Sequence, residues 1–176
     1  MQLRRTVRLL TAAGALVLAA SALTSCGFDY ATDRVYTPGA GTNDRDAGVD
    51  VLAAVVVSAE DGSGTLIATF SNNDADEQAT VDTIEGEGVT VGDFDPIEIT
   101  PGGYVNLADA DTPITVEGDY VVGDFMSMTF TFGDGSTATL DVPSVTDCFE
   151  YAGLDATAES GTPEEECVPE APAAEH

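Results

Sequence analysis

Short β-branched runs, separated by turn residues, constrain this chain more than any other feature of its sequence. Nine such runs occur between residues 49 and 142: 49–57, 65–70, 80–84, 97–99, 104–107, 114–116, 120–122, 125–132 and 137–142. The segments between them are rich in Gly, Asp, Asn and Pro, as in Gly-Asp-Gly-Ser at 133–136. Asp-Gly between alternating runs is a strong hairpin signal. Many short strands at regular spacing predict an all-β antiparallel sandwich or barrel.

The strand pattern also divides the chain into parts. Residues 26–48 are polar and turn-rich, so we expect a spacer that leads into the first strand. Residues 34–145 suit one β-sandwich domain with a modest core. Residues 146–176 are the expected acidic tail, with a short helical turn near 149–154. Residues 155–176 contain three Pro and a run of three Glu, which predicts disorder except where Cys167 holds the tail.

The first 25 residues read as a signal peptide. Three Arg precede an uncharged apolar stretch over residues 9–25. The stretch ends in Leu23-Thr24-Ser25-Cys26, which resembles a bacterial lipobox. That resemblance implies a thioether-linked lipid on Cys26 and cleavage before it, with a membrane-held protein facing outside the cytoplasm. The alternatives are an ordinary signal peptide and a transmembrane anchor, but a spanning helix needs roughly 20 apolar residues.

Two cysteines remain once Cys26 carries a lipid. Cys148 and Cys167 form an even set, and outside the cytoplasm an even set indicates a disulfide. The bridge ties the acidic tail to the end of the domain and stabilises by roughly 3 kcal/mol in the chain-entropy model. A metal site is disfavoured, because the two Cys lie far apart and no His is near them.

Several segments in order resemble the PCu(A)C type of periplasmic copper chaperone. They cover most of residues 36–143: Tyr36-Thr37-Pro38-Gly39-Ala40, the strand 64–70 closing in Ser71-Asn72-Asn73, the stretch 97–107 with its Pro-Gly-Gly turn, Gly118-Asp119, and the final hairpin 128–143 closing in Val-Pro. The resemblance implies a cupredoxin-like Greek-key β-sandwich. It also implies copper bound through His and Met, with a His-x-Met between the Gly-Gly turn and the final hairpin.

The copper ligands of that family are missing here. The corresponding stretch, residues 111–117, has neither His nor Met, and the only His is His176 at the end of the chain. Copper(I) prefers soft sulfur or imidazole ligands. Met126 and Met128 are the remaining sulfur candidates, but they alternate with Ser127 and Thr129 as core residues of a half-buried strand do. We therefore predict no metal site and no cofactor.

Acidic loops are the other candidate sites. Residues 72–77, the pair Asp93 and Asp95, and the pair Asp109 and Asp111 offer hard oxygens suited to calcium, but none has EF-hand spacing. With 32 acidic residues in the chain, solvated loops are the simpler interpretation. No nucleophile–His motif or phosphate-binding loop is present, and a carboxylate-dependent hydrolase is only a remote alternative.

The net negative charge of the chain limits the classes of partner that it can bind. The chain has 32 Asp and Glu against five Arg and no Lys, and three of those Arg lie in the leader. Nucleic-acid binding and polybasic membrane contacts need clustered Lys and Arg, so both are excluded. The acidity is interpreted as a solubility device or an organism-wide bias, with attraction of a basic partner as the third possibility.

The sequence as a whole predicts a lipid-anchored, extracytoplasmic, non-enzymatic binding or accessory protein of the cell envelope. The alternative is a carrier of copper or a divalent cation. We expect a monomer whose partners are the membrane, through the lipid on Cys26, and an envelope protein.

Overall fold

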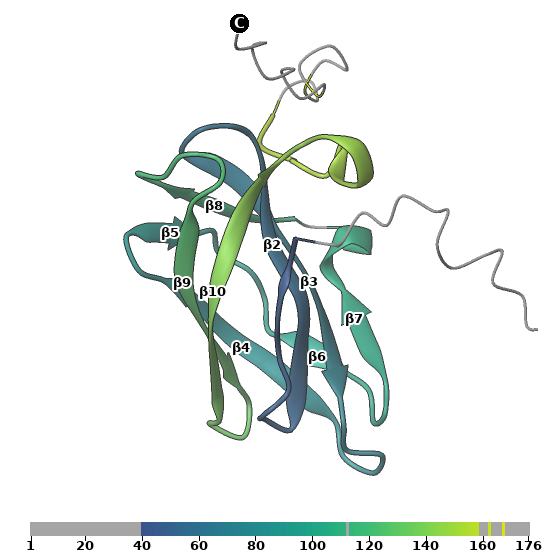
Figure 1. Ribbon diagram of the computed structural model, residues 1–176. Helices are drawn as coiled ribbons and strands as arrows, with labels where there is room; N and C mark the ends of the chain where they lie inside the picture. The colour runs from purple at the N-terminus through teal and green to yellow at the C-terminus, as the bar shows by residue number, and fades with distance from the viewer. Residues whose placement is uncertain (1–39, 112, 159–161, 163–166, 168–176) are drawn as a thin grey trace, which may run out of the picture. The chain divides into compact units, whose positions relative to one another are not determined.

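Ten strands and two short 3-10 turns make up the domain. The structure is a computed structural model that describes residues 40–111, 113–158, 162 and 167. All of these lie in the unit Gly39–His176. The strands are β1 (Thr42–Asp44), β2 (Val49–Glu60), β3 (Ser63–Asn72), β4 (Ala79–Gly86), β5 (Val89–Val91), β6 (Ile97–Ile99), β7 (Tyr104–Asn106), β8 (Ile114–Gly118), β9 (Phe125–Phe132) and β10 (Thr137–Thr146), and the turns are η1 (Leu107–Asp109) and η2 (Phe149–Tyr151) (Figure 1).

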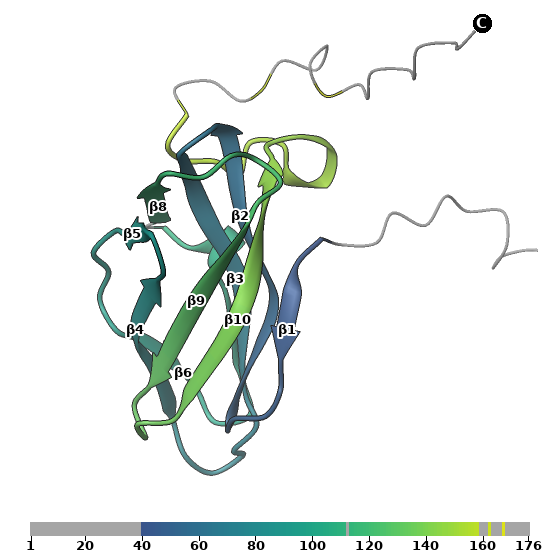
Figure 2. The ribbon, with the colours of Figure 1, turned by 60° about the vertical axis from the view of Figure 1, so that its left-hand side comes forward.

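Hydrogen bonding runs around the domain and closes a ring. The strand order is β1-β2-β10-β9-β4-β5-β8-β3-β7, and an additional β2–β3 ladder joins the two sides. Seven strands, β2, β10, β9, β4, β5, β8 and β3, therefore form a closed barrel (Figure 2). All its pairs are antiparallel except β2–β10, where Ser144–Thr146 run parallel to Val56–Ser58. The predicted all-β class is confirmed. The structure adds that ladders join the two sheets of the expected sandwich into a closed barrel.

The core follows from alternation along the strands. On β9, Met126, Met128, Phe130 and Phe132 are buried and their neighbours are more exposed. Phe130 meets Phe70 of β3 edge-to-face, with ring centroids 5.8 Å apart. Side chains at every second position of a strand thus point into the barrel, where those of β9 and β3 meet. The alternating sequence pattern predicts this packing.

Eight of the nine expected runs are strands, and residues 120–122 are not. There the chain turns instead: the Val121 amide donates to Asp124 Oδ2 at 2.9 Å, and the Asp124 amide donates to the Val121 carbonyl at 2.9 Å. Gly123 has a φ of 106°, a conformation that favours glycine. The β-branched residues here were misleading, because Asp and Gly on both sides of them favour a turn.

Two strands were not expected. β1 and β5 have three residues each, and β1 consists of Thr, Asn and Asp. Tertiary pairing decides such short segments: β1 lies beside β2, and β5 lies between β4 and β8. Their own side chains carry little strand signal.

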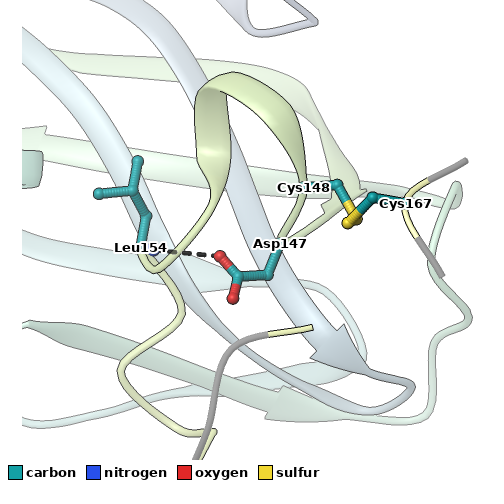
Figure 3. Close-up of a disulfide and its surroundings, with 4 residues drawn as sticks. All are labelled: Asp147, Cys148, Leu154 and Cys167. Carbon is teal, nitrogen blue, oxygen red and sulfur yellow. Dashed lines mark hydrogen bonds between the residues drawn. A yellow bond between two sulfur atoms is a disulfide. The ribbon is translucent and has the colours of Figure 1, made fainter. Parts of the chain in front are cut away.

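The chain stays attached to the barrel well past residue 146, the expected start of the acidic tail. The buried Asp155 carboxylate accepts hydrogen bonds from the Ala59 amide at 2.8 Å and the Thr65 hydroxyl at 3.2 Å. A disulfide joins Cys148 to Cys167, as predicted, and beside it the Leu154 amide donates to Asp147 Oδ1 at 3.1 Å (Figure 3).

The predicted signal peptide, the lipidation residue Cys26 and most of the spacer lie outside the described residues, as does most of the acidic tail. Among the described residues, no helix has the length and hydropathy needed to cross a bilayer.

Candidate functional site

The two methionines of β9 belong to the core. Met126 is 4% exposed and Met128 is fully buried, both within one cluster of apolar residues. Met126 also touches a surface hollow of about 380 Å³, whose acidic lining residues are Glu87, Asp119, Asp124 and Asp141. Carboxylates are hard ligands and do not complete a copper(I) site. No group of three His, Cys, Asp or Glu in the described chain is arranged to hold a metal.

The acidic loop between β3 and β4 satisfies its own polar groups. Asp74 Oδ1 accepts the amides of Asp76 at 2.8 Å and Glu77 at 3.0 Å. These backbone hydrogen bonds lower the pKa of Asp74 below its usual value. The Asn72 side-chain oxygen accepts the Asp74 amide at 2.9 Å. The carboxylate thus shapes the loop.

One part of the barrel wall divides into two tiers. β4 pairs with both β5 and β6, and β3 pairs with both β8 and β7. A ladder joins β5 to β8, whereas no ladder joins β6 to β7 in the part of the chain that the structure describes. Figure 1 shows β5 and β8 toward the upper end and β6 and β7 toward the lower end. The wall is therefore continuous in one tier and split in the other.

Asn72 holds the split together at the β6–β7 turn. Its side chain is 4% exposed, and its amide nitrogen donates to the Glu77 carbonyl at 2.8 Å and the Thr100 carbonyl at 3.3 Å. Its backbone amide donates to the Gly103 carbonyl at 2.9 Å. The buried Asn72 side chain thus links the residues before β4 to the β6–β7 turn by hydrogen bonds.

Beyond Asn72 the split opens into a hollow of about 390 Å³, which we call the wall hollow. Its lining residues come from the β5–β6 loop, β6, β7, the η1 turn and β8: Asp93, Phe94, Asp95, Ile97, Val105, Leu107, Ala110 and Ile114. Leu107 and Ile114 are buried members of the core cluster, so the floor is apolar. Phe94, Ile97 and Val105 are partly buried against the same core. The volume lies within the range of small binding sites.

Carboxylates lie in the lining of the wall hollow and next to it in the chain. Asp93 and Asp95 are exposed on the β5–β6 loop and line the hollow. Asp109 and Asp111, also exposed, are the chain neighbours of the lining residue Ala110. Asp109 accepts a hydrogen bond from the Asn106 side chain at 3.0 Å, which fixes its position. An apolar floor with an acidic rim suits a ligand that is both apolar and cationic.

Sequence reasoning found the acidic pairs but not the hollow. The sequence marked both Asp pairs as possible cation ligands. In the structure Asp93 and Asp95 line the hollow, and so does Ala110, which lies between Asp109 and Asp111 in the chain. Ile114 lies in the stretch where the resembled family carries His-x-Met, and here it contributes an apolar side chain. Phe94 between two Asp was the one local sign of an apolar group held in an acidic loop.

Three solved structures are similar to this chain. The copper-bound PCuAC domain from PmoF2 has a TM-score of 0.46 at 16% identity, covering 60% of this chain and 98% of that one. The apo PCuAC domain from PmoF1 has a TM-score of 0.46 at 15% identity, covering 60% and 99%. The apo PmoF2 PCuAC domain has 0.47 at 15% identity, covering 60% and 95%. No family model and no curated protein matches the chain. The three similar structures are domains of the type that the sequence resembles.

Proposed function

We propose that this protein is a non-enzymatic binding or accessory lipoprotein of the cell envelope, anchored through Cys26 and using the wall hollow as its binding site. The observation that carries the proposal is an apolar hollow that reaches core residues Leu107 and Ile114 from the surface. A β-barrel of this size closes its wall by ladders. A split that keeps apolar side chains accessible is a feature that a binding role explains.

The wall hollow supports binding better than catalysis. Its titratable lining groups are the exposed Asp93 and Asp95, and its other described lining residues carry no nucleophilic side chain. A carboxylate that acts as a general acid usually sits in a buried, apolar environment that raises its pKa. Exposed carboxylates at a mouth instead attract and orient a cationic ligand.

Binding at the wall hollow is tested with Nile red, a neutral apolar dye that the acidic surface does not repel. We expect its fluorescence to rise with residues 27–176, which are the processed chain without its lipid-bearing Cys26 and are called the processed chain below. It should fall strongly for Ala110→Trp, because the exposed Ala110 leaves room for an indole over the hollow. Ala75→Trp, on the exposed β3–β4 loop, is the matched control and should keep the dye bound. Equal dye binding by both variants would refute this location.

Copper carriage is the alternative, and one similar structure is described as copper-bound. The buried sulfurs of Met126 and Met128 argue against it for this chain. A copper(I) competition titration on the processed chain should therefore find no stoichiometric uptake. One equivalent that is lost in a Met126→Leu and Met128→Leu double variant would restore the carrier function.

The anchor has its own test. Cys26→Ser removes the thiol that the lipid requires, so the protein should leave the membrane fraction or fail to mature. Full membrane retention of the variant would contradict the lipid anchor.

A further inference from the structure

We infer that the wall hollow binds a basic peptide segment of a protein partner, with an apolar side chain in the hollow and a Lys or Arg on each side of it. This inference rests on the proposed function, since it names the partner of the same site. It follows from the shape of the hollow, the placement of its charges and the strand edges beside it.

The shape selects a compact apolar group. Leu107 and Ile114 form a buried floor, and Ile97 of β6 and Val105 of β7 also line the hollow. A hollow of about 390 Å³ accommodates one or two large side chains or a small molecule. Burying one Leu-sized side chain there removes apolar surface from water, which favours binding against the costs of association.

The charges in and next to the hollow favour cations beside that apolar group. Asp93 and Asp95 come from the β5–β6 loop, and Asp109 and Asp111 come from η1 and the residues after it. Arg45 is the only Lys or Arg among the described residues, and its ion pair is with Asp50 on β2, at 3.8 Å. The carboxylates at the hollow therefore attract positive charge from outside the domain.

Several carboxylates favour a chain over a single amine. An alkylamine brings one cation and leaves the other carboxylates unmatched. A peptide with the pattern basic–apolar–basic brings two cations on successive side chains. The acidic surface also repels anionic polymers and anionic lipid headgroups, which leaves a basic protein segment as the partner.

The neighbouring strands suit an extended peptide. β6 pairs only with β4 and β7 pairs only with β3 in the described chain, so each has an edge without a ladder. Unpaired strand edges supply main-chain hydrogen bonds to an added segment, while hollows beside them select its side chains.

Fluorescence anisotropy with three labelled peptides tests the inference on the processed chain at low ionic strength. The peptides share Gly flanks and differ in the centre: Lys-Leu-Lys, Lys-Ser-Lys and Glu-Leu-Glu. We expect Lys-Leu-Lys to bind about tenfold more tightly than either of the others, and added salt to weaken it. Equal binding of Lys-Leu-Lys and Lys-Ser-Lys would overturn the inference, because general attraction to an acidic protein explains that result.

Matched charge variants locate the peptide. Asp93→Asn, Asp95→Asn and Asp111→Asn together should weaken Lys-Leu-Lys about tenfold, at about 0.5 kcal/mol for each exposed pair. Glu60→Gln, Glu85→Gln and Glu150→Gln make the same change in net charge at exposed positions elsewhere and should leave the affinity nearly unchanged. Equal losses in both triple variants would overturn the location.

Two further outcomes separate this inference from the proposed function. If Nile red binds and Ala110→Trp displaces it, but Lys-Leu-Lys fails to bind, the hollow is a binding site and the peptide inference is wrong. Hexylamine that displaces Lys-Leu-Lys as effectively as the unlabelled peptide also overturns it, in favour of a small amine. If neither dye nor peptide binds, the proposed function fails as well.

Discussion

The two walls of the barrel differ in how far their ladders continue. On one side β2, β10, β9 and β4 are joined in series by ladders, with three residue pairs in the β2–β10 ladder and one register shift in the β4–β9 ladder. Met128, Phe130 and Val142 on these strands are fully buried. On the other side the wall splits at β6 and β7, and Phe94 and Val105 remain partly accessible. Apolar residues on both sides point to one core. The difference teaches that ladder continuity, more than hydrophobicity, decides which of them a ligand can reach.

The largest test of this comparison is a matched pair of phenylalanine truncations. Phe130→Ala removes a fully buried ring that packs on Phe70 and should cost about 3–5 kcal/mol of unfolding free energy. Phe94→Ala, at the wall hollow, should cost about 1 kcal/mol because its ring is already partly hydrated. Urea denaturation measures both, and equal losses would show that the two walls are packed alike.

The buried Asn72, which hydrogen-bonds the β6–β7 turn, provides the next test. Asn72→Ala leaves the Glu77 and Thr100 carbonyls without their buried donor and should cost about 2 kcal/mol. Asn73→Ala is the control, since that exposed residue loses one hydrogen bond to Asp50 and should cost under about 1 kcal/mol. Nile red binding should change with Asn72→Ala and not with Asn73→Ala, because Asn72 hydrogen-bonds both ends of the β6–β7 turn, at Thr100 and Gly103. If Asn72→Ala is as stable as Asn73→Ala, Asn72 does not hold the β6–β7 turn in place.

The smallest expected effect is a dependence on alkaline pH. Burial raises the pKa of Tyr120 above 10.0, although the hydrogen bond with Ser58 at 3.1 Å lowers it in part. The folded state then holds its proton more tightly than the unfolded state, so stability is complete below about pH 10 and falls as the pH rises above it. Tyr120→Phe should flatten this slope in urea titrations.

A matched tyrosine on the split side completes the comparison. Tyr104→Phe removes an exposed phenol from β7 but keeps Tyr120, and the alkaline slope should therefore persist. If both variants flatten the curve equally, burial of Tyr120 is not its cause.

Local patterns in the sequence predicted most of the strands and the disulfide. The alternation on β9 identified Met126 and Met128 as core residues, and Gly-Asp-Gly-Ser at 133–136 marked the β9–β10 hairpin. Each of these features depends on residues close together in the chain. The short strands β1 and β5 were missed because pairing with distant strands, not their composition, makes them strands.

The wall hollow was beyond local reasoning for a related reason. It exists because β4 and β3 each share their length between two partners, and that division is a property of the whole barrel. The sequence showed Asp93, Phe94 and Asp95 as an acidic loop with one aromatic residue. Only the register of the strands shows that this loop and the η1 turn face each other across a gap.

The single parallel pair has a consequence for how the protein folds. Ser144 of β10 pairs beside Val56 of β2, so the ring joins the last strand to one of the first. Such a non-local contact forms slowly, because closing the long loop between its partners costs entropy before the contact contributes any stability. During synthesis the barrel therefore stays open until nearly the whole domain has emerged. Until then β2 and β9 lack the strand that lies between them, and unpaired strand edges of this kind favour aggregation.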